Sequence, residues 1–317
     1  MSSSVFERVR FTGMTPDAFQ HPLDRIATEN LKRVKGFDWL CRKFVEYGIE
    51  RIEYVQNIGG SVRVAPRQMP LIYEMLRECC AILDVDEPEL YVSNGPVNAY
   101  TSGHDHPFIV LQTGLIDLMT DTEVMGVIAH ELGHIKCGHV LYKTMARAIK
   151  PFFEMLGSAT LGAGKLVGAG IEAALGAWDQ RSELSSDRAA LLVLQDATPC
   201  LSMLMKLAGG TRRMPEQLSV EQFLNQARAY REGMDEKMLD RFYRFIGSMG
   251  ITHPFPVERA RALDEWVNSA EYQAILAGNY PRKPVLLPAG KTCPTCKQTA
   301  QPNDRFCNHC GTPIKTH

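Results

Sequence analysis

The feature that most constrains this chain is an H-E-x-x-H motif, His130-Glu131-Leu-Gly-His134, set within an apolar run over residues 124–135. On a helix, a spacing of four places His130 and His134 on one face, one turn apart, so both imidazoles can reach one zinc ion. Glu131 lies beside them, where it can take a proton from metal-bound water. The alternative, two histidines that only satisfy hydrogen bonds, is disfavoured because burying idle imidazoles among apolar flanks is costly.

A catalytic zinc ion usually has three protein ligands and one open position, so a third ligand must come from elsewhere in the chain. His139 is a poor candidate, since on a continuous helix it would lie about 140° further round than His134. Glu183 and Asp187 stand one turn apart at the start of an apparent helix. We predict that Glu183 binds the metal and that Asp187 accepts the free N–H of a ligand histidine. Alone, the pair would also suit a solvated helix start.

The order of these elements resembles peptidase family M48, which includes the type I CAAX prenyl proteases and the HtpX heat-shock proteases. The resemblance is carried by residues 112–119 and 123–135 and by the Glu183/Asp187 pair, and it extends over residues 70–270. It implies a gluzincin metalloendopeptidase that hydrolyses peptide bonds in protein or peptide substrates, in protein quality control or processing. The best-known members span membranes several times, whereas no clear span is visible in this sequence.

Two further elements match the family. Val97-Asn98-Ala99-Tyr100 resembles the strand before its zinc helix, and Asn98, Ala99 and Tyr100 are expected to pair with an extended substrate backbone. Ordinary hairpin packing is the alternative for this strand. By analogy with the family, His253 would donate to the developing oxyanion as a second catalytic residue, although His-Pro also suits a plain loop-to-helix junction. Arg259 would anchor this segment to a carboxylate, or lie on the surface.

A second metal pattern lies near the C-terminus. Cys293 and Cys296 form one C-x-x-C knuckle, and Cys307 and Cys310 form another ten residues further on. Two such knuckles can present four thiolates tetrahedrally to one zinc ion, and a segment this short needs a metal or disulfides to fold. The segment resembles zinc-ribbon modules, so we expect a structural zinc ion and a protein partner. A redox dithiol and an iron–sulfur cluster are the disfavoured alternatives.

Composition limits the partners and the compartment. Lys and Arg total 35 and Asp and Glu total 36, for a net charge of -1, which disfavours nucleic-acid binding. The N-terminus shows no apolar signal segment, and the other five of the nine cysteines are scattered, so we expect a cytoplasmic protein with reduced thiols. Residues 150–178 are rich in Gly and Ala. They suit either membrane-peripheral contact or a small-residue helical pair packed on the core.

These patterns predict a mainly helical α+β protein, with a gluzincin-type protease domain, a small antiparallel sheet and a C-terminal four-cysteine zinc ribbon. Rival functions are an inactive zinc-dependent scaffold or adaptor and a membrane-peripheral chaperone-like protein. The expected organisation is a metallopeptidase domain over 1–278 with a helical arm at 1–69 and an insert at 150–178, a Pro-rich linker at 279–292 and the ribbon at 293–317. Helices are expected at 29–57, 70–83, 121–145, 180–207, 219–248 and 257–276, and strands at 89–92, 98–101 and 108–112.

Overall fold

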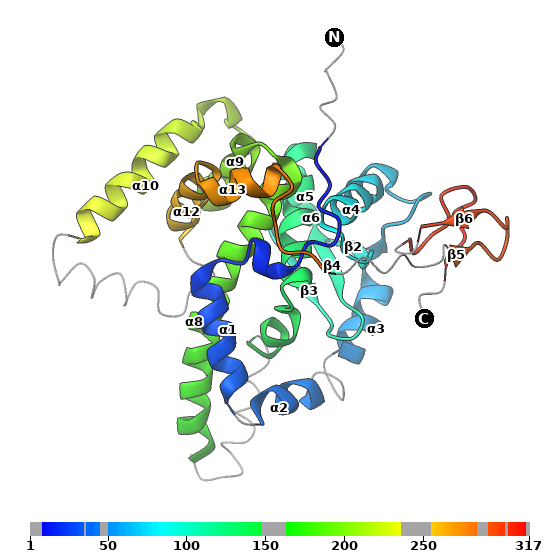
Figure 1. Ribbon diagram of the computed structural model, residues 1–317, viewed down its shortest axis with the longest axis horizontal. Helices are drawn as coiled ribbons and strands as arrows, with labels where there is room; N and C mark the ends of the chain where they lie inside the picture. Colours follow the sequence, from blue (N-terminus) through cyan, green and yellow to red (C-terminus); the bar gives the residue numbers. More distant parts are fainter. Residues whose placement is uncertain are drawn as a thin grey trace.

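Two packed helices, α6 (Asp121–Lys136) and α8 (Ala163–Leu194), form the centre of the computed structural model (Figure 1). A capping box starts α6, in which Thr120 and Glu123 each accept a hydrogen bond from the other's backbone N–H. The hydrophobic residues that follow the cap bury α6 against α8 and the sheet. The structure describes residues 8–34, 36–44, 50–146, 163–235, 255–283, 291–301 and 304–314.

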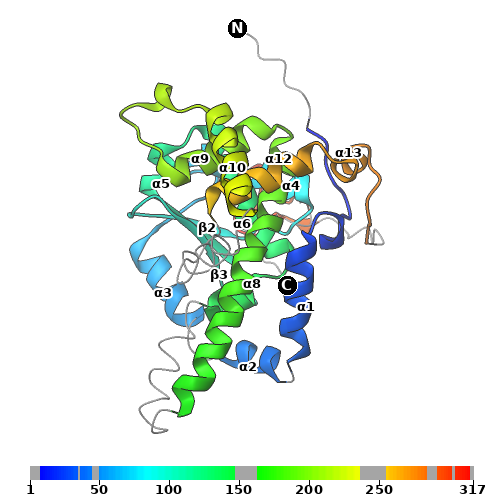
Figure 2. The same ribbon diagram turned by 90° about the vertical axis from the view of Figure 1, so that its left-hand side faces the viewer.

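The other helices surround this central pair. They are α1 (Pro22–Arg33), α2 (Phe37–Phe44), α3 (Glu50–Gly60), α4 (Pro70–Leu83), α5 (Thr113–Leu118), α9 (Ala197–Gly209), α10 (Val220–Asp235), α12 (Pro256–Val267) and α13 (Ala270–Leu276), with 3-10 turns η1 (Pro16–Ala18) and η3 (Pro215–Gln217). A further helical segment at 140–146 follows α6. Helices α4 and α9 pack against both central helices, and α1 and α12 pack against α8. Figures 1 and 2 both show α1 running alongside α8, although the two helices are far apart in the sequence.

A four-stranded sheet lies beside α6 with the strand order β1-β2-β4-β3. Its strands are β1 (Val62–Arg63), β2 (Glu89–Ser93), β3 (Ala99–Ser102) and β4 (Phe108–Gln112). The pairs β1–β2 and β3–β4 are antiparallel, but β2 and β4 are parallel, with Tyr91 opposite Val110. The mainly helical fold class is confirmed, whereas the wholly antiparallel sheet is wrong. The sheet is mixed because β3 does not lie between β2 and β4. It pairs with the outer side of β4 as an antiparallel hairpin, and this leaves β4 beside β2, with both strands running in the same direction.

Four of the predicted helices are divided in the structure. Residues 29–57 lie in three helices, 121–145 in two, 180–207 in α8 and α9, and 257–276 in α12 and α13. Gly36 and Gly138 break the first two with φ of 79° and 71°, in the left-handed region that favours glycine. Ser269 caps α13 and so separates it from α12. The turn at Gly138 affects the site most, because it redirects the chain immediately before His139.

Two hydrophobic cores meet along α8. The main core joins the apolar faces of α4, α6, α9, α12 and the sheet, and the N-terminal segment adds the fully buried Phe11 and Phe19. The second core joins α1, α2, the 140–146 helix and the first half of α8, including Trp178. Glu183 and Asp187 lie on α8 between the residues that belong to these two cores. The polar site is therefore held by apolar packing on both sides.

The C-terminal cysteine-rich segment rests on α4 and the main core (Figure 1). Its strands β5 (Lys291–Thr292) and β6 (Thr299–Ala300) form an antiparallel pair. Phe306 joins the main core and meets Tyr73 of α4 edge-on, with ring centroids 5.9 Å apart. An ion pair joins Arg77 of α4 to Asp304 with 3.1 Å between N and O. These contacts make the segment part of the molecular surface around α4.

The Gly/Ala-rich region is continuous with the site. Residues 163–178 form the first half of α8, which has 32 residues and carries Glu183 in its second half. Residues 150–162 of the predicted insert, and 284–290 of the predicted linker, lie outside the described residues. Within the described ranges, none of the helices combines the length and the hydropathy that crossing a membrane requires.

Candidate active site and metal centres

The first metal centre lies between α6 and α8. His130 Nε2 is 3.3 Å from one carboxylate oxygen of Glu183, and His134 Nε2 is 3.2 Å from the other. One donor atom from each residue lies within 4.8 Å of the other two, and all three side chains are buried. Ligands about 2.0–2.1 Å from a tetrahedral zinc ion lie about 3.3–3.4 Å apart. The imidazole and carboxylate donors therefore fit zinc in both chemistry and spacing.

Two buried residues, Asp187 and Arg259, contact the donors His130 and Glu183 and hold them in place. Asp187 Oδ1 lies 3.1 Å from His130 Nδ1, the ring nitrogen on the side away from Glu183. Arg259 of α12 donates to both oxygens of Asp187, at 2.8 and 2.6 Å, and its Nη1 lies 3.2 Å from Glu183. A guanidinium held in two directions in this way has little freedom to rotate. Arg259 thus fastens α12 to the site on α8.

A lysine approaches the same carboxylate from the opposite side. Lys143, on the 140–146 helix, donates to Glu183 at 2.7 Å and to Asp179 at 2.8 Å. Two cations offset half of the charge of the four carboxylates around the centre. The two negative charges that remain are what a divalent ion would neutralise. These carboxylates are Glu131, Asp179, Glu183 and Asp187, and the cations are Lys143 and Arg259.

The two histidines respond to this charge in opposite ways in the metal-free protein. Burial would lower the pKa of His130, but hydrogen bonds to Asp187 and Glu183 outweigh it and raise the pKa to about 9. Burial and the nearby Lys143 lower the pKa of His134 well below its ordinary value. His134 is therefore the histidine that is more readily neutral, the form in which an imidazole binds a metal.

Glu131 lies beside the metal centre and is held by the sheet. The hydroxyl of Thr101, in β3, donates to the Glu131 carboxylate at 2.6 Å. Thr101 is fully buried, and β3 is an outer strand of the sheet. Ala99 and Tyr100 lie in the same strand, and the carbonyl of Asn98 just before it accepts a hydrogen bond from Gln112. The structure thus brings the predicted substrate strand next to the predicted base.

One residue that the sequence predicts for this site, His253, is not described by the structure, and two residues at the site, Lys143 and Thr101, were not predicted. His253 lies outside the described residues. Lys143 and Thr101 received no role from the sequence, although strand alternation already puts Thr101 on the face opposite Tyr100. Lys143 carried no comparable signal, because its partners are reached only after the turn at Gly138 folds the chain back towards α8.

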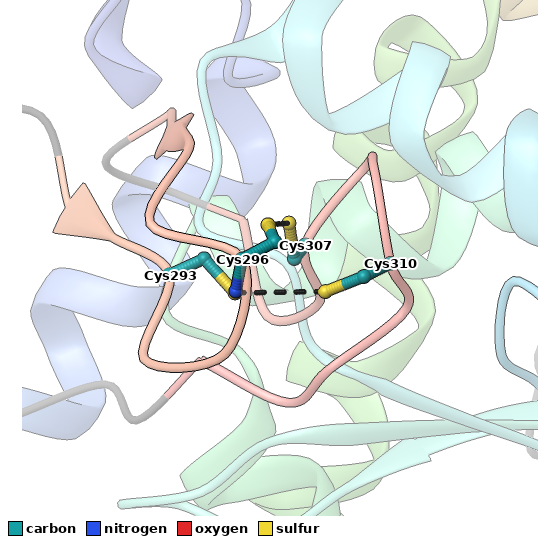
Figure 3. Close-up of side chains that lie close together, drawn as sticks. All are labelled: Cys293, Cys296, Cys307 and Cys310. Atoms are coloured by element: carbon teal, nitrogen blue, oxygen red, sulfur yellow. Dashed lines mark hydrogen bonds between the residues drawn. The ribbon is translucent and has the colours of Figure 1, made fainter.

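The second metal centre is the cluster of four cysteines (Figure 3). Sulfur atoms lie 3.6 Å apart between Cys293 and Cys310, and 3.5 Å apart between Cys296 and Cys307. Thiolates about 2.3 Å from a tetrahedral zinc ion lie about 3.8 Å apart, so this cluster also fits zinc. The Thr312 hydroxyl and backbone N–H lower the pKa of Cys310 to about 6, which favours the thiolate. Each of the nine cysteines is free of disulfide bonds.

Comparison with known proteins agrees with this geometry. Residues 66–267 match Peptidase family M48. "Plastoglobule-localized metallopeptidase 48, chloroplastic" from Arabidopsis thaliana is 40% identical over 271 residues, which are 84% of this chain and 77% of that protein. A "Protease HtpX homolog" from Caldanaerobacter subterraneus subsp. tengcongensis is 33% identical over 100 residues, 31% of this chain and 33% of that protein. The chain therefore matches about a third of the length of this HtpX homologue.

Among solved structures, the crystal structure of S. mikatae Ste24p gives a TM-score of 0.37 at 17% identity, over 78% of this chain and 60% of that one. A score this low supports no conclusion about shared architecture. The family match covers well over half of the sequence, and the Arabidopsis relative is similar over most of both chains. The chain therefore belongs to Peptidase family M48 and is a zinc metallopeptidase.

Proposed function

We propose that this protein is a zinc-dependent endopeptidase whose general base is Glu131. The observation that carries the proposal is the placement of the Glu131 carboxylate, held by Thr101 at 2.6 Å, beside the donor set of His130, His134 and Glu183. A zinc ion bound by those three residues would polarise the scissile carbonyl and make water a better nucleophile at neutral pH.

Glu131 performs the proton transfers in this proposal. Its carboxylate takes a proton from the attacking water and then passes that proton to the leaving amine, a role worth about 10²–10⁴-fold in rate. The hydrogen bond from Thr101 leaves the second carboxylate oxygen to face the reacting atoms. Thr101 therefore orients the base without competing for the proton. We keep His253 as the proposed donor to the oxyanion, on the strength of its family resemblance.

The substrate would be a protein or peptide in extended conformation, aligned along β3. Backbone pairing with Asn98, Ala99 and Tyr100 would place a scissile bond near Glu131, because Thr101 follows directly in the same strand. Recognition through the backbone tolerates many side chains. We therefore propose shallow sequence specificity, which suits quality control or general processing.

The four cysteines would hold a second, structural zinc ion. A closed set of four thiolates leaves no open position for a substrate, so this ion would have no part in the chemistry. Cys293 and Cys307 are buried, whereas Cys296 and Cys310 are half-buried near the surface. We propose that the ribbon offers a surface for a protein partner or substrate next to α4.

The compartment is proposed from the sequence and from one relative. The Arabidopsis relative is named for plastoglobules, which favours a membrane-peripheral position for a protein of this kind. We propose a cytoplasmic or membrane-peripheral protein, with contact through residues 150–178. Flotation of the full chain with liposomes, with and without residues 151–162, tests the part of this contact that precedes α8; equal partitioning of the two proteins would contradict that part.

The decisive experiment combines metal analysis with proteolysis. The purified chain should contain two zinc ions by mass spectrometry and should cleave casein. Glu131→Gln should retain both ions and lose cleavage, whereas Asp121→Asn, an exposed change at the start of the same helix, should cleave as the wild type does. Equal cleavage by wild type and Glu131→Gln would show that Glu131 is not the base.

A further inference from the structure

A buried chain of hydrogen bonds leads from the zinc centre into the N-terminal helix. His134 Nδ1 lies 3.0 Å from His139 Nδ1, and His139 Nε2 lies 3.0 Å from Asp24 Oδ2 in α1. The three side chains are at most 1% exposed. Asp24 and His139 are 115 positions apart in the sequence, and Asp24 lies outside the residues 66–267 that match the peptidase family.

The hydrogen-bond partners determine which nitrogen of each ring carries its proton. His134 turns Nε2 towards Glu183, so a neutral His134 that binds zinc through Nε2 carries its proton on Nδ1 and donates it to His139. His139 then accepts at Nδ1 and must carry its own proton on Nε2, which it donates to Asp24. Both N–H groups in this series of hydrogen bonds therefore point away from the metal site and towards the carboxylate of Asp24.

Asp24 is suited to end such a chain. Its Oδ2 accepts from His139, from Ser185 at 2.5 Å and from Gln20 at 3.0 Å, while its Oδ1 accepts from Thr28 at 3.0 Å. All four contacts are with donors, which is the environment of an ionised carboxylate. Ser185 lies on α8, two positions from Glu183, so Asp24 also connects α1 to the helix that supplies the third zinc donor.

We propose that His139 and Asp24 are positioning residues of the zinc centre, which hold His134 in the tautomer and orientation that bind the metal. This inference rests on the proposed zinc site. It makes α1 a functional part of the peptidase, since the carboxylate that completes the chain comes from outside the segment matched by the family. Partners of this kind typically change metal affinity by about 10–100-fold.

The test measures zinc affinity by titrating the purified full-length protein with a zinc chelator. Asp24→Asn retains the shape and can still accept from His139, but it removes the charge. His139→Leu removes the acceptor for His134, and His139→Asn restores an acceptor oxygen where Nδ1 stood. The matched control is Thr28→Val, because Thr28 bonds the other oxygen of Asp24 and accepts from Trp178, yet stands outside the chain to His134.

We expect Asp24→Asn and His139→Leu to raise the dissociation constant of one of the two zinc ions by about 10–100-fold, with partial recovery in His139→Asn. Thr28→Val should lower the melting temperature and leave both zinc affinities unchanged. The inference fails if both variants bind zinc as the wild type does, or if Thr28→Val weakens zinc equally. If Asp24→Asn does not fold, the difference in zinc affinity between His139→Leu and His139→Asn decides whether the inference holds. Should Glu183→Gln leave zinc content unchanged, the proposed zinc site itself is wrong, and this inference with it.

Discussion

The two candidate metal centres have similar donor spacing but very different surroundings. The donors of the first centre sit on two long helices, and buried partners from α1, α12 and the 140–146 helix hold them. The four cysteines stand on short loops, and among the described residues their own buried core consists of Cys293, Ala300, Cys307 and Ile314. The first centre is therefore organised by protein packing, whereas the second would depend on the proposed structural zinc ion for its local fold.

The largest effect is expected where the metal replaces a hydrophobic core. Cys307→Ser should unfold the ribbon locally, because a structural zinc site contributes about 10–16 kcal/mol to the folding of such a module. Zinc content should fall from two ions to one, and a protease should cut near residues 284–301. Casein cleavage should remain, since the first centre is separate.

The matched control is Cys137→Ser, a half-buried cysteine outside the cluster, which should retain both ions and resist digestion. Loss of both zinc ions in Cys307→Ser would show that the two centres fold as one unit and are not organised independently.

A smaller effect is expected from the first centre without its metal. Glu183→Gln should destabilise the zinc-depleted protein by about 3–5 kcal/mol, because Lys143 and Arg259 lose a buried partner. The control is Glu265→Gln, since Glu265 also lies between two cations, Arg231 and Arg261, but is exposed. That change should cost less than about 1 kcal/mol. Urea unfolding of the two variants gives the comparison, and similar losses would contradict the buried character of the first centre.

The surface on which the ribbon rests should respond to pH. Burial raises the pKa of Glu87 from 4.5 to about 7, with Arg77 opposing the rise and Asp304 adding to it. The folded state then holds this proton more tightly than the unfolded state, so the contribution of Glu87 to stability is highest below about pH 4.5 and falls as the pH rises through 7. The full loss is about 3 kcal/mol.

Glu87→Gln, which mimics the protonated acid, should match the wild type near pH 4.5 and exceed it in stability at pH 8. Glu74→Gln, an exposed change on α4, should behave as the wild type at both values. Thermal unfolding at the two pH values measures this. A Glu87→Gln curve parallel to that of the wild type would show that Glu87 is not the titrating group.

Motifs predicted His130, His134 and the four cysteines as metal donors because they encode local geometry. The spacing within His130-Glu131-x-x-His134 is read on one helix, and the four cysteines lie close together in sequence. The divided helices are hard to predict because a left-handed glycine such as Gly138 ends a helix whose apolar periodicity continues beyond it. The mixed sheet is hard to predict because strand patterns do not indicate on which side of β4 the β3 hairpin lies.

The residues that hold the donors were harder to predict, because their roles depend on distant contacts. On a continuous helix His139 would point away from His134. After the turn at Gly138 it lies beside His134 and reaches Asp24, 115 positions earlier in the chain. Neither residue carries a recognisable motif, so only the packing of α1 on α8 reveals the connection.

The smallest effect tests whether helix packing alone positions the first centre. Gly133 lies between the two histidines, and a Cβ there would come within 2.7 Å of Ala189 Cβ and 3.0 Å of the Ser186 backbone. Gly133→Ala should therefore push α6 from α8 and cost about 1–3 kcal/mol. Gly176→Ala on α8 meets nothing within 4 Å and should be neutral or stabilising by up to about 1 kcal/mol. If Gly133→Ala lowers casein cleavage and the affinity of one zinc ion while the ribbon keeps its zinc, the first centre owes its geometry to helix packing. Unchanged cleavage and affinity in a destabilised Gly133→Ala would instead mean that the ion draws its own ligands together, as in the ribbon.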